Sequence, residues 1–127
     1  MKKIISTVNA PKPIAPYEQG VIVDNKIYLS GQIGIDPKTS ELVLGGIDME
    51  TKQVMKNIKA ILEEANSDMN NIIKATIMLA NINDMGKVNE IYQSYFQKGA
   101  YPARSAFQVA ALPKQALIEI EIIAISK

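Results

Sequence analysis

The segment 116–126 is apolar on both of the faces that a β-strand presents. Alternate side chains along a strand point to opposite faces of a sheet. One face is wholly aliphatic and the other combines aliphatic side chains with two carboxylates: Ile118, Ile120, Ile122 and Ala124 on the first, and Leu117, Glu119, Glu121, Ile123 and Ile125 on the second. A strand with this pattern is usually buried on both sides. The segment therefore predicts a strand that is buried on both faces, in a sheet that needs a covering layer on each side.

The rest of the chain predicts an α+β protein with the element order β-β-β-α-β-α-β-β. Helices follow from apolar side chains at helical spacing, and strands follow from alternation between turn-prone residues. The expected elements are strands at 21–23 and 26–30, a short strand before Gly45-Gly46, a helix over 49–65 capped by Asp48, a strand over 73–79, a helix capped by Asn83 and ending near Gly99, and strands over 104–109 and 116–126.

Two helices can cover only one face of such a sheet. A second copy of the chain is the economical cover for the other face, so the sequence predicts a homo-oligomer. The same pattern places Glu119 and Glu121 on a face that is expected to be buried. Unpaired charges are costly there, so these two carboxylates are candidates either for function or for ion pairs.

Length and charge narrow the class of protein further. A chain of 127 residues without a linker or repeat predicts one domain over 1–127, which buries about two-thirds of the surface of the open chain. The net charge of +1 argues against a nucleic-acid or membrane surface. No apolar run is long enough for a signal peptide or a membrane span, so a soluble, cytoplasmic protein is expected.

The chain contains no Cys and no His. This absence excludes disulfides, a thiolate nucleophile, a His-based triad and zinc sites built from these residues. The 13 acidic residues form no cluster with EF-hand spacing, so no metal site is expected. General acid–base chemistry is left to Glu, Asp, Lys, Tyr or water.

Arg104 is the only arginine among the 14 cationic residues. A guanidinium is always charged, and its planar fork of donors matches a carboxylate in a way that a lysine ammonium does not. We therefore interpret Arg104 as a candidate carboxylate clamp. The alternative interpretation is a structural ion pair with Glu119 or Glu121, since buried pairs are commonly structural.

Each of the other candidate residues also has both a functional and a structural interpretation. Glu119 and Glu121 are a potential general base or water-positioning group, or members of an internal salt bridge and an interface pair. Tyr17 and Ser30 can present hydroxyls to a ligand or serve packing and strand ends. Gly31 and its neighbours form no phosphate-binding motif.

Taken together, the motifs resemble those of the RidA family, the reactive-intermediate imine deaminases of YjgF type, along nearly the whole chain. The motifs that carry the resemblance occur in order: Asn9-Ala10-Pro11, Pro16-Tyr17-Glu18-Gln19-Gly20, Ser30-Gly31-Gln32-Ile33, Val88-Asn89, Pro102-Ala103-Arg104-Ser105, Val109-Ala110-Ala111-Leu112-Pro113 and Ile118-Glu119-Ile120-Glu121. The similarity is to the deaminase-active archetype, whose mark is the arginine. It implies a chorismate-mutase-like fold and a homotrimer with a barrel-like centre, helices outside, and sites between subunits.

The resemblance also implies the reaction, which is hydrolysis of 2-iminoacids, released by pyridoxal-phosphate dehydratases, to 2-oxoacids and ammonia without a cofactor. Arg104 would clamp the substrate carboxylate, and Glu119 would position water through its carboxylate or its backbone carbonyl. Tyr17 is a further catalytic candidate. The implied lining of the pocket is Tyr17, Ser30, Gly31, Asn89, Ser105 and Ala106. Ala106 departs from the family pattern, because many relatives carry Cys two positions after the arginine, so no thiol chemistry is expected here.

Two alternatives stay open at the level of sequence. The first is a non-catalytic regulatory trimer that binds small carboxylates or a partner protein through the same arginine. The second is a translation inhibitor or endoribonuclease, roles that some family members suggest. The near-neutral charge and the 6% aromatic content argue against the second alternative.

Overall fold

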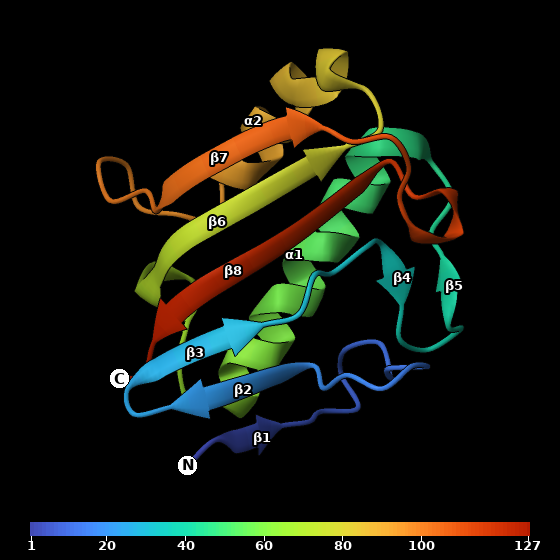
Figure 1. Cartoon of the computed structure of the whole chain (residues 1–127). Helices are drawn as coiled ribbons and strands as arrows, with labels where there is room; N and C mark the ends of the chain where they lie inside the picture. Colours follow the sequence, from blue (N-terminus) through green and yellow to red (C-terminus); the bar gives the residue numbers. More distant parts are fainter.

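The computed structural model describes residues 1–127 as a six-stranded mixed sheet with both α-helices on one face (Figure 1). The strand order is β1-β2-β3-β8-β6-β7, and a separate two-stranded sheet joins β4 to β5. This arrangement confirms the predicted α+β fold. The elements are β1 (Lys3–Ile5), β2 (Gly20–Val23), β3 (Lys26–Leu29), β4 (Ile35–Asp36), β5 (Glu41–Leu42), α1 (Gly46–Glu64), β6 (Ile72–Leu79), α2 (Met85–Gln93), β7 (Ala103–Gln108) and β8 (Ile118–Ile125).

Strand β8 lies in the middle of the large sheet. It pairs antiparallel with β3 on one side and with β6 on the other. The one parallel pair is β6 with β7, and α2 lies in the crossover between them. A backbone bridge between Gln32 and Ile120 fastens the chain after β3 to the same strand.

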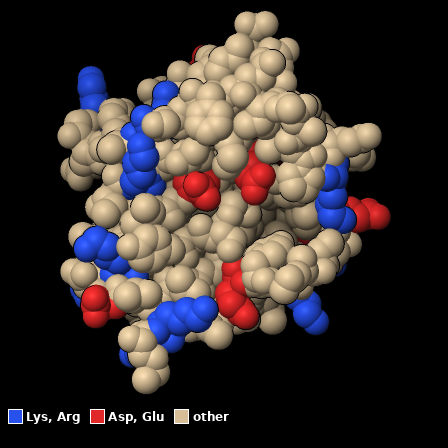
Figure 2. Space-filling view, in the orientation of Figure 1, with Lys and Arg blue, Asp and Glu red and all other residues tan.

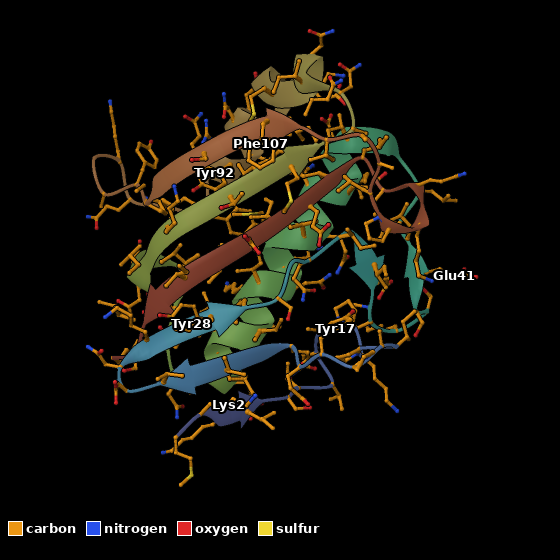
Figure 3. The ribbon with its side chains drawn as sticks, in the orientation of Figure 1. Lys2, Tyr17, Tyr28, Glu41, Tyr92 and Phe107 are labelled. Carbon is orange, nitrogen blue, oxygen red and sulfur yellow. The ribbon has the colours of Figure 1, made fainter.

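The two faces of the sheet differ sharply in burial. Toward the helices, Ile118, Ile120 and Ala124 of β8 are fully buried in the hydrophobic core. The opposite face has no covering layer within the chain (Figure 1). On this open face Tyr28 of β3 and Phe107 of β7 are 40% and 46% exposed (Figure 3).

Some element boundaries differ from the predictions. Strand β1 was not predicted, because three residues are too few to display a period of two, yet it pairs with β2. Helix α1 begins at Gly46, so the prediction of Asp48 as its N-cap is wrong. Gly45 occupies the cap position with φ of 116°, a left-handed conformation that glycine adopts at no steric cost.

Helix α2 is shorter than predicted at both ends. Asn83 lies in a 3₁₀ turn before the helix, where Asn81 rather than Asn83 provides the side-chain cap. The helix ends at Gln93, and the apolar stripe continues to Phe96 through turns whose N–H groups bond three residues back. Such turns keep side chains on the same face, so the sequence pattern overestimates the length of the helix. Neither α-helix combines the length and apolar character needed to cross a bilayer.

Buried polar side chains of α1 attach the helix to the neighbouring loops. Asn57, which is fully buried, donates hydrogen bonds to the carbonyl oxygens of Ile33 and Ile35 at 3.3 and 2.9 Å. Its own side-chain oxygen accepts from Gln53. Asn57 therefore positions the segment that follows Gly31.

We predict that Asn57→Ala lowers the free energy of unfolding by about 1–3 kcal/mol, because it leaves two partly buried carbonyl groups without their donor. Denaturant unfolding of the two proteins measures this difference. Lys56→Ala, at an exposed position of the same helix, is the matched control and should change stability by less than about 0.5 kcal/mol. Equal effects of the two substitutions would contradict the role given to Asn57.

Candidate functional site

The structure separates the predicted site residues into two groups on opposite faces of the sheet. In the parallel pairing of β6 and β7, Arg104 lies beside Ala75, whose side chain is buried under the helices. Glu119 of β8 belongs to the opposite parity and lies on the open face, where its register partner is Met78. The alternation of side chains along a strand therefore keeps Arg104 and Glu119 of one chain apart.

Arg104 forms the first group together with side chains of α2. Its Nη1 donates a hydrogen bond to Asn89 Oδ1 at 2.8 Å, and its Cζ lies 5.2 Å from the centroid of the Tyr92 ring. Tyr101 also lines the shallow hollow beside them. We call Asn89, Tyr92, Tyr101 and Arg104 the Arg104 cluster. The guanidinium is exposed, and only one of its five N–H donors is used within the chain.

Burial, rather than the nearby charge, favours the neutral form of the Tyr92 hydroxyl. Burial raises the pKa of Tyr92, and the positive charge of Arg104 offsets part of that rise. The hydroxyl is buried and has no hydrogen-bond partner. Tyr92 thus contributes its ring rather than a titratable group to the cluster.

The second group surrounds Glu119. A hollow of about 430 Å³ is lined by residues from the proline-rich N-terminal loop, the segment after β3 and the start of β8 with the turn before it. We call five of its lining residues the Glu119 hollow: Tyr17, Gly31, Gln32, Lys114 and Glu119. The Glu119 carboxylate occupies the space that a Cβ at position 31 would need, so a larger residue there would displace that carboxylate.

The carboxyl group of Glu119 is perturbed by its surroundings. Burial raises its pKa, and the neighbouring charge of Glu121 raises it further. Both side chains belong to the parity of β8 that faces away from the helices. Acidic side chains gather near the middle of this face, whereas lysine and arginine lie mainly toward its rim (Figure 2). A raised pKa makes the ionised carboxylate a stronger proton acceptor than an ordinary glutamate.

The remaining predicted residues lie near one group or the other. Ser30 donates a 2.6 Å hydrogen bond to the carbonyl of Glu18 and borders a second hollow that it shares with Tyr17. Ser105 accepts a 3.2 Å hydrogen bond from the Lys74 ammonium. Tyr17 is half-exposed in the N-terminal loop (Figure 3).

Ala106 follows Arg104 by two positions and therefore faces the helices too. It packs against the hydrophobic core, as does its register partner Ile77, which is fully buried. Its side chain is thus a packing group at the base of the Arg104 cluster.

The structural ion pair considered for Arg104 does not form within the chain. The one ion pair joins Lys127 to Asp68 at 3.2 Å on the surface. Arg104 cannot meet Glu119 or Glu121 because the sheet lies between them. That interpretation of the three charges is wrong for the single chain.

Sequence reasoning missed two residues beside these groups. Tyr92 appeared only as a member of the apolar stripe of α2, and nothing in the pattern indicated that its ring would lie under Arg104. Glu50 is a buried carboxyl group of α1 whose Oε1 accepts a 2.8 Å hydrogen bond from the N–H of Leu117, two residues before Glu119. Burial raises the pKa of Glu50, and that hydrogen bond offsets part of the rise.

The two groups differ in their chemistry. The Arg104 cluster offers an exposed, oriented cation for a carboxylate, and the Glu119 hollow offers a perturbed carboxyl group beside a cavity. No group of three or more Asp and Glu side chains is placed to hold a metal ion. The class that this arrangement defines is an α+β protein with an exposed, oriented cation on one face of its sheet and a perturbed carboxyl group on the other.

Comparison with known proteins places the chain in a family. Residues 7–126 match the family model described as Endoribonuclease L-PSP. A mouse protein named 2-iminobutanoate/2-iminopropanoate deaminase is 54% identical, with 98% of this chain and 92% of that protein aligned. A crystal structure of a Rid family protein from Yersinia pestis is 47% identical with a TM-score of 0.96, covering 98% of this chain and 99% of that one. The chain belongs to the RidA family, as its motifs predicted.

A third relative was solved with a small molecule bound. The crystal structure of E. coli TdcF with bound serine has a TM-score of 0.91 and 37% identity, covering 98% of this chain and 99% of that one.

We predict that the Glu119 carboxyl group titrates above the ordinary range for glutamate and that Glu121→Gln shifts its pKa downward. Removing a like charge favours the ionised form of the remaining carboxyl group. Side-chain carboxyl chemical shifts followed by NMR across a pH series measure both values. Glu64→Gln, at an exposed position on α1, serves as the control and should leave the Glu119 titration unchanged. An ordinary Glu119 pKa in the unsubstituted protein would contradict the electrostatic description given above.

Proposed function

We propose that this chain is a 2-iminobutanoate/2-iminopropanoate deaminase, a hydrolase that converts reactive 2-iminoacids to 2-oxoacids and ammonia. The observation that carries the proposal is the exposed guanidinium of Arg104, fixed by Asn89 and free to bind a carboxylate. The near full-length identity of 54% to the mouse deaminase supports the same activity. Serine in the E. coli relative supports a site for small molecules that carry a carboxylate.

The reaction needs orientation more than activation, because a protonated imine is already electrophilic. Arg104 binds the substrate carboxylate and thereby fixes the imine carbon in attack geometry. Water adds to the C=N bond while Glu119 takes its proton, giving a carbinolamine. Glu119 then returns the proton to nitrogen. As the C–N bond breaks, the Glu119 carboxylate takes the hydroxyl proton and the C=O bond forms, and this proton passes to the released ammonia, giving ammonium and a 2-oxoacid.

The remaining predicted residues complete this site. Tyr17, Ser30 and Gly31 line it beside Glu119, whereas Asn89 fixes Arg104 at the other side. Ser105 and Ala106 contribute their backbone next to the arginine. No cofactor takes part in these steps.

The site is completed between subunits of a homotrimer. Arg104 and Glu119 lie on opposite faces of one sheet, so a substrate that touches both requires two copies of the chain. A neighbouring subunit over the open face would also cover the exposed Tyr28 and Phe107. In the proposed trimer the sheets form a barrel-like centre with the helices outside.

The proposed role is protective and cytoplasmic. Pyridoxal-phosphate-dependent dehydratases release enamines that tautomerise to 2-iminoacids, and these intermediates damage other pyridoxal enzymes. A deaminase near such a dehydratase removes them before they react.

We expect Arg104→Ala to lower the acceleration of 2-oxobutanoate release from threonine plus threonine dehydratase by on the order of 10²-fold. Arg104→Lys should restore only a small part of this acceleration, because an ammonium keeps the charge but not the planar fork of donors. Light scattering should confirm an intact oligomer for each variant, and Lys56→Ala is the active control. Wild-type activity in the Arg104→Ala protein would contradict the proposal that Arg104 binds the substrate carboxylate.

Complementation tests whether the site is shared between subunits. Arg104→Ala and Glu119→Gln are each expected to be nearly inactive, whereas a co-refolded equal mixture should regain activity. In a random mixture about a quarter of the sites combine the unsubstituted Arg104 of one chain with the unsubstituted Glu119 of its neighbour. Mixing the two proteins without unfolding is the control. A mixture as inactive as its components would show that no site is shared.

An RNA-directed function is the second candidate, because the matching family model is described as Endoribonuclease L-PSP. The acidic centre of the open face and the net charge of +1 work against phosphate binding there (Figure 2). RNA cleavage that survives Arg104→Ala and declines with salt would favour this function. Binding of 2-oxobutanoate without imine turnover would instead favour a regulatory carboxylate-binding trimer.

A further inference from the structure

The ring of Tyr92 lies directly beneath the only guanidinium of the chain. The Cζ atom of Arg104 is 5.2 Å from the ring centroid, while Asn89 holds the Nη1 edge of the same group at 2.8 Å. Asn89 and Tyr92 are three residues apart on α2, a spacing that places two side chains on one face of a helix. One helix face therefore touches both an edge and a face of the guanidinium.

The ring itself is held in place by other aromatic side chains. Phe96 packs against Tyr92 with the centroids 4.8 Å apart, and Tyr101 meets Phe96 edge-on at 6.4 Å. Tyr92 is only 5% exposed and belongs to the main hydrophobic core. The surface offered to Arg104 is thus rigid, unlike a solvated side chain that would move with it.

We infer that Tyr92 is a positioning residue for the deaminase reaction, whose ring sets the plane of the Arg104 guanidinium for bidentate binding of the substrate carboxylate. This inference rests on the proposed function. An exposed arginine on a flexible stem loses side-chain entropy when it binds, and a preset plane reduces that cost. The attraction between a cation and an aromatic face holds the group there while its outward donors stay free.

The inference assigns the effect to the ring and not to the hydroxyl group. The Tyr92 hydroxyl is buried without a hydrogen-bond partner, so removing it breaks no bond within the chain. Phenylalanine keeps the aromatic face, whereas leucine fills much of the space without one. These two substitutions separate the proposed role from any role of the hydroxyl.

The single arginine allows a direct measurement, because its Nε–H gives one assignable NMR signal in arginine-labelled protein. The same signal, followed during titration with 2-oxobutanoate, reports the Kd of the reaction product. We expect a ring-current displacement of the signal in the wild type and in Tyr92→Phe, and its loss in Tyr92→Leu. We further expect Tyr92→Leu to raise Kd by about three- to tenfold and Tyr92→Phe to change it by less than about twofold.

Tyr95→Leu is the matched control, since Tyr95 is a partly buried tyrosine of the same apolar stripe that does not line the hollow beside Arg104. It should leave both the signal and Kd unchanged, whereas a merely structural loss of packing would appear in both leucine variants. If Tyr92→Leu does not fold, Tyr92→Met replaces it. A wild-type signal without ring-current displacement, or an unchanged Kd in the leucine or methionine variant, overturns the inference. A wild type that binds 2-oxobutanoate but hydrolyses no imine overturns the proposed function instead.

Discussion

Burial of β8 is the constraint on which the rest of the molecule depends. The strand pairs on both edges, and its helix-facing side chains, with Ile118 and Ile120 among them, are fully buried. Helix α1 is tied to the residue just before this strand by the hydrogen bond from the Leu117 N–H to Glu50. Removing this strand would separate β3 from β6 and leave neither helix a complete surface to pack against. The position of the Glu119 carboxyl group follows from the central position of β8 in the sheet.

Because β8 is held in this way, the side chains on its other face are held in place too. Glu119 must point away from the helices, and the close approach of Gly31 leaves the carboxylate a defined position at the edge of a cavity. The cost is a carboxyl group that is partly removed from water and close to a like charge, which raises its pKa. That cost is tolerable in a group that exchanges a proton during catalysis, as proposed for Glu119.

The parallel pairing of β6 with β7 determines where Arg104 lies, which is the other half of the proposed site. It turns Arg104 toward α2, where Asn89 and Tyr92 hold an edge and a face of the guanidinium. The guanidinium of Arg104 and the carboxyl group of Glu119 therefore lie on opposite faces of one sheet. The proposed trimer explains how a divided site of this kind becomes complete, and why the open face retains apolar side chains such as Phe107.

The sequence by itself determined the α+β class, the apolar last strand and the family, because alternation and ordered motifs are local features. It did not reveal β1, whose three residues are too short for a period, or the true end of α2, because a 3₁₀ turn continues the same stripe. It identified Arg104 and Glu119 but left open an ion pair between them. Only the tertiary structure placed these residues on opposite faces and Tyr92 under the guanidinium, because strand pairing and helix packing join residues that no spacing along the chain relates.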